Sequence, residues 1–214
     1  MFPSISKNRK KANSITDGSP RKGMVFIPDI SGFTELVRST DLVTGRIITS
    51  ELLSVIIRHN RLDMEIAEIE GDAVFFFKWS SIPSVDALFE QFEIMKSAFD
   101  AKIRELEYRY DIEPALHLKA VAHYGEMTGF SIEGFQKLYG EVVVEAHRLL
   151  KNAVPARSYL LVTDELMAAA GTKESEALLR KGHSSTLCEL YEGVRNLCFT
   201  YILFPYLRQA PARV

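Results

Sequence analysis

The sequence "FIPDISGFTEL", residues 26–36, joins an apolar run to a Ser-Gly-Phe-Thr turn through a single carboxylate, Asp29. The apolar run begins at residue 24, is rich in strand-forming residues and predicts a buried strand. An acid at the end of such a strand has two interpretations. Asp29 and Ser31 could cap the helix that follows, or Asp29 could hold a charged group. The local stretch leaves both interpretations open.

The composition predicts one globular domain with short flanking segments. The chain has 214 residues, of which 47% are hydrophobic and 25% charged, and its net charge is −2. These values are ordinary for a globular protein. Positive charge is concentrated in residues 1–23, which predict a flexible basic tail. Residues 24–205 predict the folded domain, and residues 206–214 a C-terminal tail.

The same composition argues against several partners and locations. The net charge gives the whole chain no attraction to nucleic acid or anionic lipid, so we do not expect nucleic-acid binding. No apolar run approaches the roughly 18 uncharged residues of a membrane span. Cys188 and Cys198 show no metal-binding spacing, which favours a reducing, cytoplasmic location.

Hydrophobic periodicity predicts an α+β protein. The expected elements are a strand at 24–28, a short helix at 34–40, a helix from 44 to about 58, a hairpin within 63–79 that turns at 70–72, a helix at 83–110, strands at 115–127 and 135–140, a helix at 141–153, a strand from 158 followed by a helix at 163 or 164, and a strand at 197–204. This order indicates antiparallel pairing, with the helices gathered on one face of the sheet.

Two carboxylates fall at matched places in this arrangement. Asp29 ends the first strand, and Asp72 lies at the tip of the hairpin that would pair beside it. Converging acids repel each other, and a divalent cation commonly reconciles them. The backbone N–H groups of Gly32, Phe33 and Thr34 open the next helix, and a helix N-terminus attracts phosphate. Together these features indicate a nucleotide site.

Four segments resemble the motifs of class III adenylate and guanylate cyclases. "FIPDISGFTEL" looks like their opening motif, an apolar strand followed by D-I-x-G-F-T, and "EIEGDAVFFF" (68–77) looks like their second, with G-D-A before a hydrophobic strand. "LHLKAVAHYGEM" (116–127) is similar to the family strand that ends in H-x-G. "YGEVVVEAHRLLKNA" (139–153) is similar to the helix W-G-x-x-V-N-x-A-x-R-L. The matches fall in family order.

The resemblance implies a ferredoxin-like nucleotide-cyclase fold, with an antiparallel sheet core and helices packed mainly on one face. It implies that Asp29, Asp72 and the backbone carbonyl of Ile30 bind two Mg²⁺ or Mn²⁺ ions, which activate the ribose 3′-hydroxyl and steady the triphosphate. It also implies that Arg148 stabilises charge on the α-phosphate of a purine nucleoside triphosphate. The family works as a head-to-tail dimer, so we expect a homodimer in which one subunit supplies the metal ligands and the other supplies Arg148.

Three positions depart from the family pattern. Val144 stands where the family has the asparagine that orients the ribose, and valine cannot form a hydrogen bond through its side chain. The loop lysine that grips the triphosphate is not matched, although Arg195 lies nearby in the sequence. The base-selecting positions hold Glu68 and Lys137, which either recognise guanine or pair with each other across the dimer interface.

The matches and departures predict a cyclase-like domain that binds metal and a purine nucleoside triphosphate, with weak or lost catalysis. Two alternatives stay open. The first is an active cyclase that converts ATP or GTP to a cyclic nucleotide and pyrophosphate. The second is a non-catalytic protein-interaction module, because a fold alone does not establish an activity.

Overall fold

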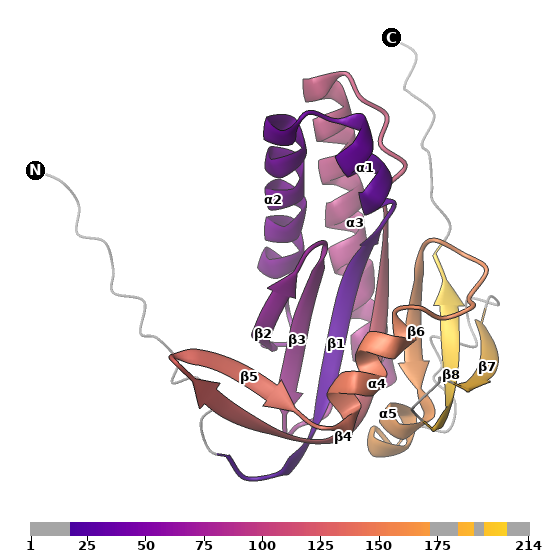
Figure 1. The fold of residues 1–214 in the computed structure, drawn as a ribbon. Helices are drawn as coiled ribbons and strands as arrows, with labels where there is room; N and C mark the ends of the chain where they lie inside the picture. The colour runs from indigo at the N-terminus through magenta and orange to yellow at the C-terminus, as the bar shows by residue number, and fades with distance from the viewer. Residues whose placement is uncertain (1–17, 172–183, 191–194, 205–214) are drawn as a thin grey trace, which may run out of the picture.

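The structure is a computed structural model that describes residues 18–171, 184–190 and 195–204, and its strands form one mixed sheet (Figure 1). In chain order the elements are β1 (Arg21–Ser31), α1 (Phe33–Ser39), α2 (Leu42–Arg58), β2 (Glu65–Glu70), β3 (Ala73–Trp79), α3 (Val85–Tyr110), β4 (His117–Ile132), β5 (Phe135–Tyr139), α4 (Glu141–Leu149), β6 (Tyr159–Thr163), α5 (Asp164–Ala169), β7 (Ser184–Leu190) and β8 (Asn196–Leu203). The sheet order is β2-β3-β1-β4-β6-β8-β7, and β5 pairs with β4 outside this path. Among the strand pairs of the described residues, β4–β6 alone is parallel.

The central strand β1 is buried on both faces because successive side chains point to opposite sides of a sheet. Met24 and Phe26 pack into the core that α2 and α3 cover. Val25 and Ile27 point to the other face, where α4 packs against them. Since α1, α2, α3 and α5 all contribute to the first core, most helices lie on one face, and α4 lies on the other (Figure 1). The predicted α+β arrangement is confirmed.

The C-terminal edge of the sheet holds an element that the sequence did not predict. Strand β7 pairs antiparallel with β8, and its side chains are mostly exposed, so it lacks the buried alternation that signals a strand. Cys188 and Cys198 face each other across this pair and form a disulfide. Disulfides are typical of oxidising compartments. The cytoplasmic location was inferred from reduced cysteines, and the disulfide does not support that inference. The location stays a prediction.

The first strand begins earlier than expected. Residues 21–23, assigned from the sequence to the basic tail, pair with β4, and the Arg21 guanidinium lies 4.3 Å from the centroid of the Trp79 ring. This cation–π contact gives a basic residue a place on the sheet. Residues 1–17 and 206–214 of the two predicted tails lie outside the described residues. Within the described part of the chain, no helix is long and apolar enough to cross a membrane.

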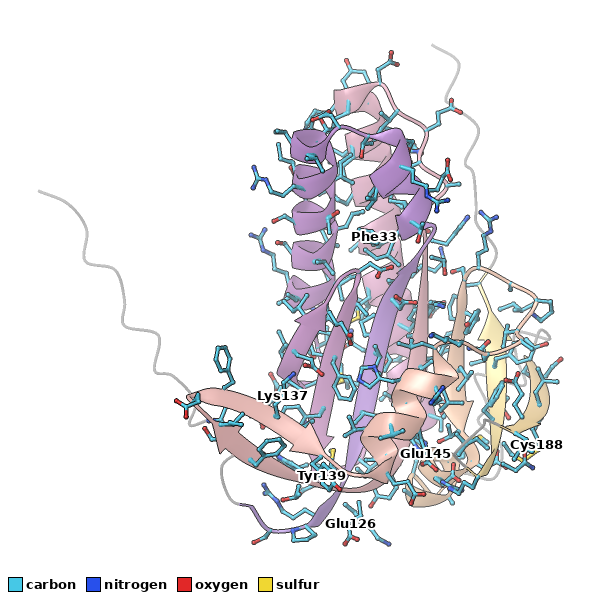
Figure 2. The ribbon with its side chains drawn as sticks, viewed as in Figure 1. Phe33, Glu126, Lys137, Tyr139, Glu145 and Cys188 are labelled. Carbon is cyan, nitrogen blue, oxygen red and sulfur yellow. A yellow bond between two sulfur atoms is a disulfide. The ribbon has the colours of Figure 1, made fainter. Side chains whose placement is uncertain are left out.

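The hairpin of β4 and β5 extends away from the main sheet and carries exposed apolar side chains (Figure 1). Phe135 and Tyr139 on β5 are each 71% exposed, and Phe130 and Ile132 on β4 are also exposed. Figure 2 shows Tyr139 on this arm, close to where the hairpin meets the sheet. Apolar side chains gathered on one arm are typical of an interaction surface.

Candidate metal and nucleotide site

The turn between β2 and β3 lies against the end of β1, which brings the two predicted metal-binding acids together. Asp29 pairs across β1 and β3 with Ala73, the residue that follows Asp72. The Ile30 N–H donates a hydrogen bond of 3.3 Å to the Asp72 carbonyl oxygen. Acids far apart in the sequence therefore converge because an antiparallel pairing carries the hairpin tip to the strand end.

Asp29 does not cap the helix that follows it. The N-cap residue of α1 is Gly32, which has a φ of 93° and no side-chain capping bond. A Cβ on Gly32 would lie 2.4 Å from the Ala115 carbonyl oxygen, so the backbone conformation and the close packing both require glycine. The capping interpretation of Asp29 and Ser31 is wrong. The carboxylate of Asp29 is left to interact with a charged group.

Lys119 is that charged group, and sequence reasoning missed it. Its Nζ lies 3.0 Å from Asp29 Oδ2 and donates a hydrogen bond of 3.0 Å to the Leu150 carbonyl oxygen. The two residues face each other in register across β1 and β4. The lysine side chain is 17% exposed and the aspartate side chain 15%. The signal in the sequence was a lysine within an otherwise apolar strand, but only the strand register identifies its partner.

Asp72 forms no ion pair with any residue that the structure describes. Burial raises the pKa of Asp72 to about 6, the negative charge of Asp29 adds to the effect, and Lys119 opposes it. An ionised Asp72 is therefore unfavourable in the folded chain unless a cation accompanies it. Carboxylate oxygens with uncompensated charge are the ligands that Mg²⁺ and Mn²⁺ prefer, so these residues fit a divalent ion.

Replacing Asp72 with asparagine is expected to stabilise the metal-free protein at pH 7.5. A raised pKa means that ionisation opposes folding, so the benefit is present above pH 6 and vanishes as the pH falls below 3.8, the ordinary pKa of an aspartate side chain. The shift corresponds to at most about 3 kcal/mol, which solvent screening of this partly exposed group reduces to about 1–2 kcal/mol. Urea unfolding of both proteins at pH 7.5 and pH 4 measures it. An equal gain at both pH values would contradict the electrostatic cause.

A cavity of about 750 Å³ opens beside these acids. It is lined by Asp29, Glu68, Glu70, Gly71, Asp72, Ala73, Lys137, His147, Arg148, Leu150 and Lys151. The carboxylates come from β1, β2 and the β2–β3 turn, whereas Arg148 and Lys151 come from the end of α4 and the segment after it. Neither Arg148 nor Lys151 has an ion-pair partner among the described residues. The cavity thus has an acidic wall suited to a cation and a basic wall suited to an anion.

Only some of the site residues predicted from the sequence line this cavity. Asp29, Asp72, Glu68, Lys137 and Arg148 line it together. Glu68 and Lys137 form an ion pair within one chain, with side chains that are 30% and 47% exposed. Their carboxylate and ammonium groups therefore satisfy each other within one chain, and not across a dimer interface as the pairing interpretation expected.

The remaining predicted residues lie outside the cavity lining. Ile30 is buried, with 2% of its surface exposed. Gly32, Phe33 and Thr34 stand at the start of α1, and Figure 2 shows Phe33 well apart from Lys137. Val144 is 53% exposed on α4 and does not line this cavity.

A further set of possible metal ligands lies on the acidic side of the cavity. One ligand atom from each of Glu68, Glu70 and His147 lies within 4.8 Å of the others. The His147 ring packs 5.3 Å from the Phe75 ring, which holds the imidazole beside the hairpin tip. Sequence spacing could not reveal this group because its members come from β2 and α4. It adds to the negative potential of that wall.

A buried network behind α4 supports the helix that carries Arg148. His123 is fully buried, its Nε2 lies 2.7 Å from Glu145 Oε2, and its Nδ1 lies 2.8 Å from Thr163 Oγ1. With the proton on Nε2, the ring donates to the carboxylate and accepts from the hydroxyl. Arg195 Nε donates to Glu145 Oε1 at 2.7 Å. Burial alone would raise the pKa of Glu145, but the hydrogen bonds from His123 and Arg195 outweigh it and lower the pKa.

Arg195 is consequently not available in this chain to replace the missing triphosphate lysine. Its guanidinium binds Glu145 and also pairs with Glu165. It lines a different cavity, of about 790 Å³, beside α5 and the base of the β4–β5 hairpin. Figure 2 shows Glu145 on α4, on the side of the molecule toward β7 and β8. Two carboxylates neutralise the one guanidinium, so little positive charge is left for phosphate.

Comparison with known proteins places the chain in a family. Residues 49–159 match the model of DUF2652, described as a protein of unknown function. The chain belongs to the DUF2652 family. The uncharacterized protein Rv2561/Rv2562 of Mycobacterium tuberculosis (strain ATCC 25618 / H37Rv) is 31% identical over 146 residues, which cover 65% of this chain. The match spans 66% of the length of that relative.

Solved structures with similar folds include cyclase domains. The adenylyl cyclase CyaB from P. aeruginosa is 18% identical with a TM-score of 0.57, covering 90% of this chain and 98% of its own. The guanylyl cyclase Cya2 is 16% identical with a TM-score of 0.62, covering 90% of this chain and 96% of its own. A class III adenylyl cyclase-like ATP-binding protein from Pseudomonas aeruginosa is 16% identical with a TM-score of 0.61, covering 76% of this chain and 36% of its own. The DUF2652 chain therefore has the class III nucleotide-cyclase fold that its motifs predicted.

Proposed function

We propose that this chain is a class III nucleotide cyclase-like domain that binds a divalent metal ion and a purine nucleoside triphosphate as a homodimer, with weak or absent turnover. In this role it serves nucleotide-dependent signalling in the cytoplasm. The observation that carries the proposal is the cavity whose acidic wall contains Asp29 and Asp72 and whose basic wall contains Arg148 and Lys151. A metal–triphosphate complex has the matching charges, with a cation on one side and phosphate oxygens on the other.

The residues divide the proposed work in a simple way. Asp72, with Asp29 beside it, would hold Mg²⁺ or Mn²⁺, which supplies charge neutralisation at the phosphates. Arg148 would bind phosphate oxygens, because guanidinium donors match their geometry and the side chain is not engaged elsewhere in the described structure. The solved relative named as a class III adenylyl cyclase-like ATP-binding protein supports nucleotide binding by this fold.

Homodimer formation is supported by the exposed apolar surface of the arm and its surroundings. The contributing side chains are Phe130, Ile132, Phe135 and Tyr139 on the arm, Ile66 and Ile69 on β2, and Val144 on α4. A second copy that covered this surface would remove large apolar groups from water, which favours association. Because Asp29, Asp72 and Arg148 of one chain line the same cavity, the proposed site does not require Arg148 from the second subunit.

Weak turnover follows from two of the three departures from the family pattern, namely Val144 and the missing triphosphate lysine. Val144 offers no hydrogen bond to a ribose, and loss of one transition-state hydrogen bond costs a factor of about 10²–10³ in rate at comparable sites. Arg195 is neutralised by Glu145 and Glu165 and does not replace the triphosphate lysine.

Binding of nucleotide with Mn²⁺ is tested by thermal unfolding. ATP or GTP with Mn²⁺ at 100 times the dissociation constant should stabilise the protein by about 2.7 kcal/mol, which corresponds to a rise in Tm of about 5–10 °C for a chain of this size. Asp72→Asn is the matched control, because it removes a ligand without weakening the fold, and it should abolish the rise. No shift with either nucleotide in the wild type would contradict the proposal.

The same samples separate the two alternatives. Formation of cyclic product by the wild type, abolished in Asp72→Asn, would establish an active cyclase instead of a weakened one. A protein that dimerises but shows no shift with Mn²⁺, ATP or GTP would instead be a non-catalytic interaction module. If no nucleotide binding is measured, the exposed apolar side chains of the β4–β5 hairpin favour this second alternative.

A further inference from the structure

The ammonium group of Lys119 occupies the space beside Asp29 where a cation would be expected. Its Nζ lies 3.0 Å from Asp29 Oδ2 and 3.0 Å from the Leu150 carbonyl oxygen. Leu150 is the C-cap residue of α4, so this carbonyl belongs to the negative end of the helix dipole. Two acceptors from different elements hold the ammonium in place, and 17% of the lysine side chain is exposed.

The strand pairing fixes the position of Lys119 relative to Asp29. Lys119 and Asp29 lie directly opposite each other in the long β1–β4 ladder, which runs without a register shift from Arg21 to Ser31. A cross-strand pair of opposite charges is favourable in such a ladder. The backbone pairing therefore places the lysine next to the acid.

The charges at the site leave room for one divalent ion. Asp29 and Asp72 together carry two negative charges when both are ionised, and Lys119 already supplies one positive charge. One divalent ion then gives the group a net charge of about +1, before any phosphate binds, and a second would make it strongly positive. A divalent ion bound through Asp29 Oδ2 would also lie close to the ammonium, and like charges at such distances repel in a partly buried site.

We propose that Lys119 is a built-in cation that takes the place of one of the divalent ions beside Asp29 and Asp72, so that the site binds a single divalent ion, held chiefly by Asp72. This inference rests on the proposed function, because it concerns the metal site of that same cavity. It also gives a physical reason for weak turnover. An ammonium group neutralises charge, but it does not coordinate a hydroxyl oxygen and lower its pKa as a metal ion does.

The number of bound ions is the quantity to measure, with Mn²⁺ alone as the probe. Bound Mn²⁺ per chain is counted at pH 7.5 by calorimetry and by the electron-spin signal of free Mn²⁺. Only ions lost in Asp72→Asn are assigned to the site, which removes any contribution from Glu68, Glu70 and His147. We expect one such ion in the wild type and two in Lys119→Met. The matched control is Lys137→Met, which removes a lysine that lines the cavity but pairs with Glu68 instead of Asp29, and it should stay at one.

Each result decides a different part of the argument. Two site ions in the wild type would overturn the role of Lys119 and leave the proposed metal site standing. One ion in folded Lys119→Met would overturn it as well. No site ion in the wild type and none in Lys119→Met would overturn the metal site of the proposed function itself. If Lys119→Met does not fold, anomalous diffraction from wild-type crystals grown with Mn²⁺ still distinguishes one ion beside an intact Lys119–Asp29 pair from two ions.

Discussion

Glu145→Ala is expected to lower the free energy of unfolding by about 3–5 kcal/mol, the range seen when one partner of a buried ionic network is removed. Only 2% of Glu145 is exposed, and its carboxylate accepts hydrogen bonds from both His123 and Arg195. Without it, a fully buried imidazole loses its partner and a cavity forms beneath α4. Urea unfolding at pH 7.5 measures the loss. Because α4 carries Arg148, the variant should also weaken binding at the acidic cavity.

The same helix provides the control for this prediction. Glu141 is exposed in the first turn of α4, and Glu141→Ala should cost less than about 1 kcal/mol, mostly through its interaction with the helix dipole. The lowered pKa of Glu145 means that its contribution is present above 4.5, the ordinary pKa of a glutamate side chain, and is lost as the pH falls below it. Equal stabilities for the two variants at pH 7.5 would show that the network does not support the helix.

Asp29→Ala is expected to lower the free energy of unfolding by about 2–3 kcal/mol, because it leaves the ammonium of Lys119 partly buried without its carboxylate. The effect is smaller than for Glu145 for two reasons. The pair is about one-sixth exposed, and removing Asp29 relieves its repulsion of Asp72. Thermal unfolding should show a Tm lower by about 4–10 °C. The sign is opposite to that predicted for Asp72→Asn, although both acids were assigned to one metal site.

Two further variants test the cause of this loss. The double variant Asp29→Ala with Lys119→Met removes both charges and should recover most of the stability, since the cost comes from the unpaired ammonium. Glu68→Ala breaks the more exposed pair with Lys137 in the same cavity and should cost less than about 1 kcal/mol. A double variant as unstable as Asp29→Ala would point to lost packing instead of lost charge pairing.

Local sequence predicted most of the secondary structure, because periodicity and turn chemistry act over a few residues, whereas the cyclase-like fold was implied by the resemblance of four motifs. The hairpin turn at Glu70-Gly71-Asp72 and the helix at 85–110 follow directly from these signals. Strand β7 was not predicted, because an edge strand with mostly exposed side chains lacks the alternating apolar pattern that indicates a strand. The start of β1 was not predicted, because Arg21 and Lys22 follow other basic residues. Only the structure shows that these residues pair with β4 and that Arg21 makes a cation–π contact with Trp79.

The sequence by itself predicted that Asp29 and Asp72 converge; the tertiary structure decided what they face. Asp29 and Asp72 were found from motifs because each lies at a recognisable strand end or turn. The ion pair of Asp29 with Lys119, the unpaired state of Asp72 among the described residues and the engagement of Arg195 by Glu145 all depend on strand register and helix packing. Coulomb interactions act through space over a few ångströms, and no local pattern in a sequence encodes the distance between residues 90 positions apart.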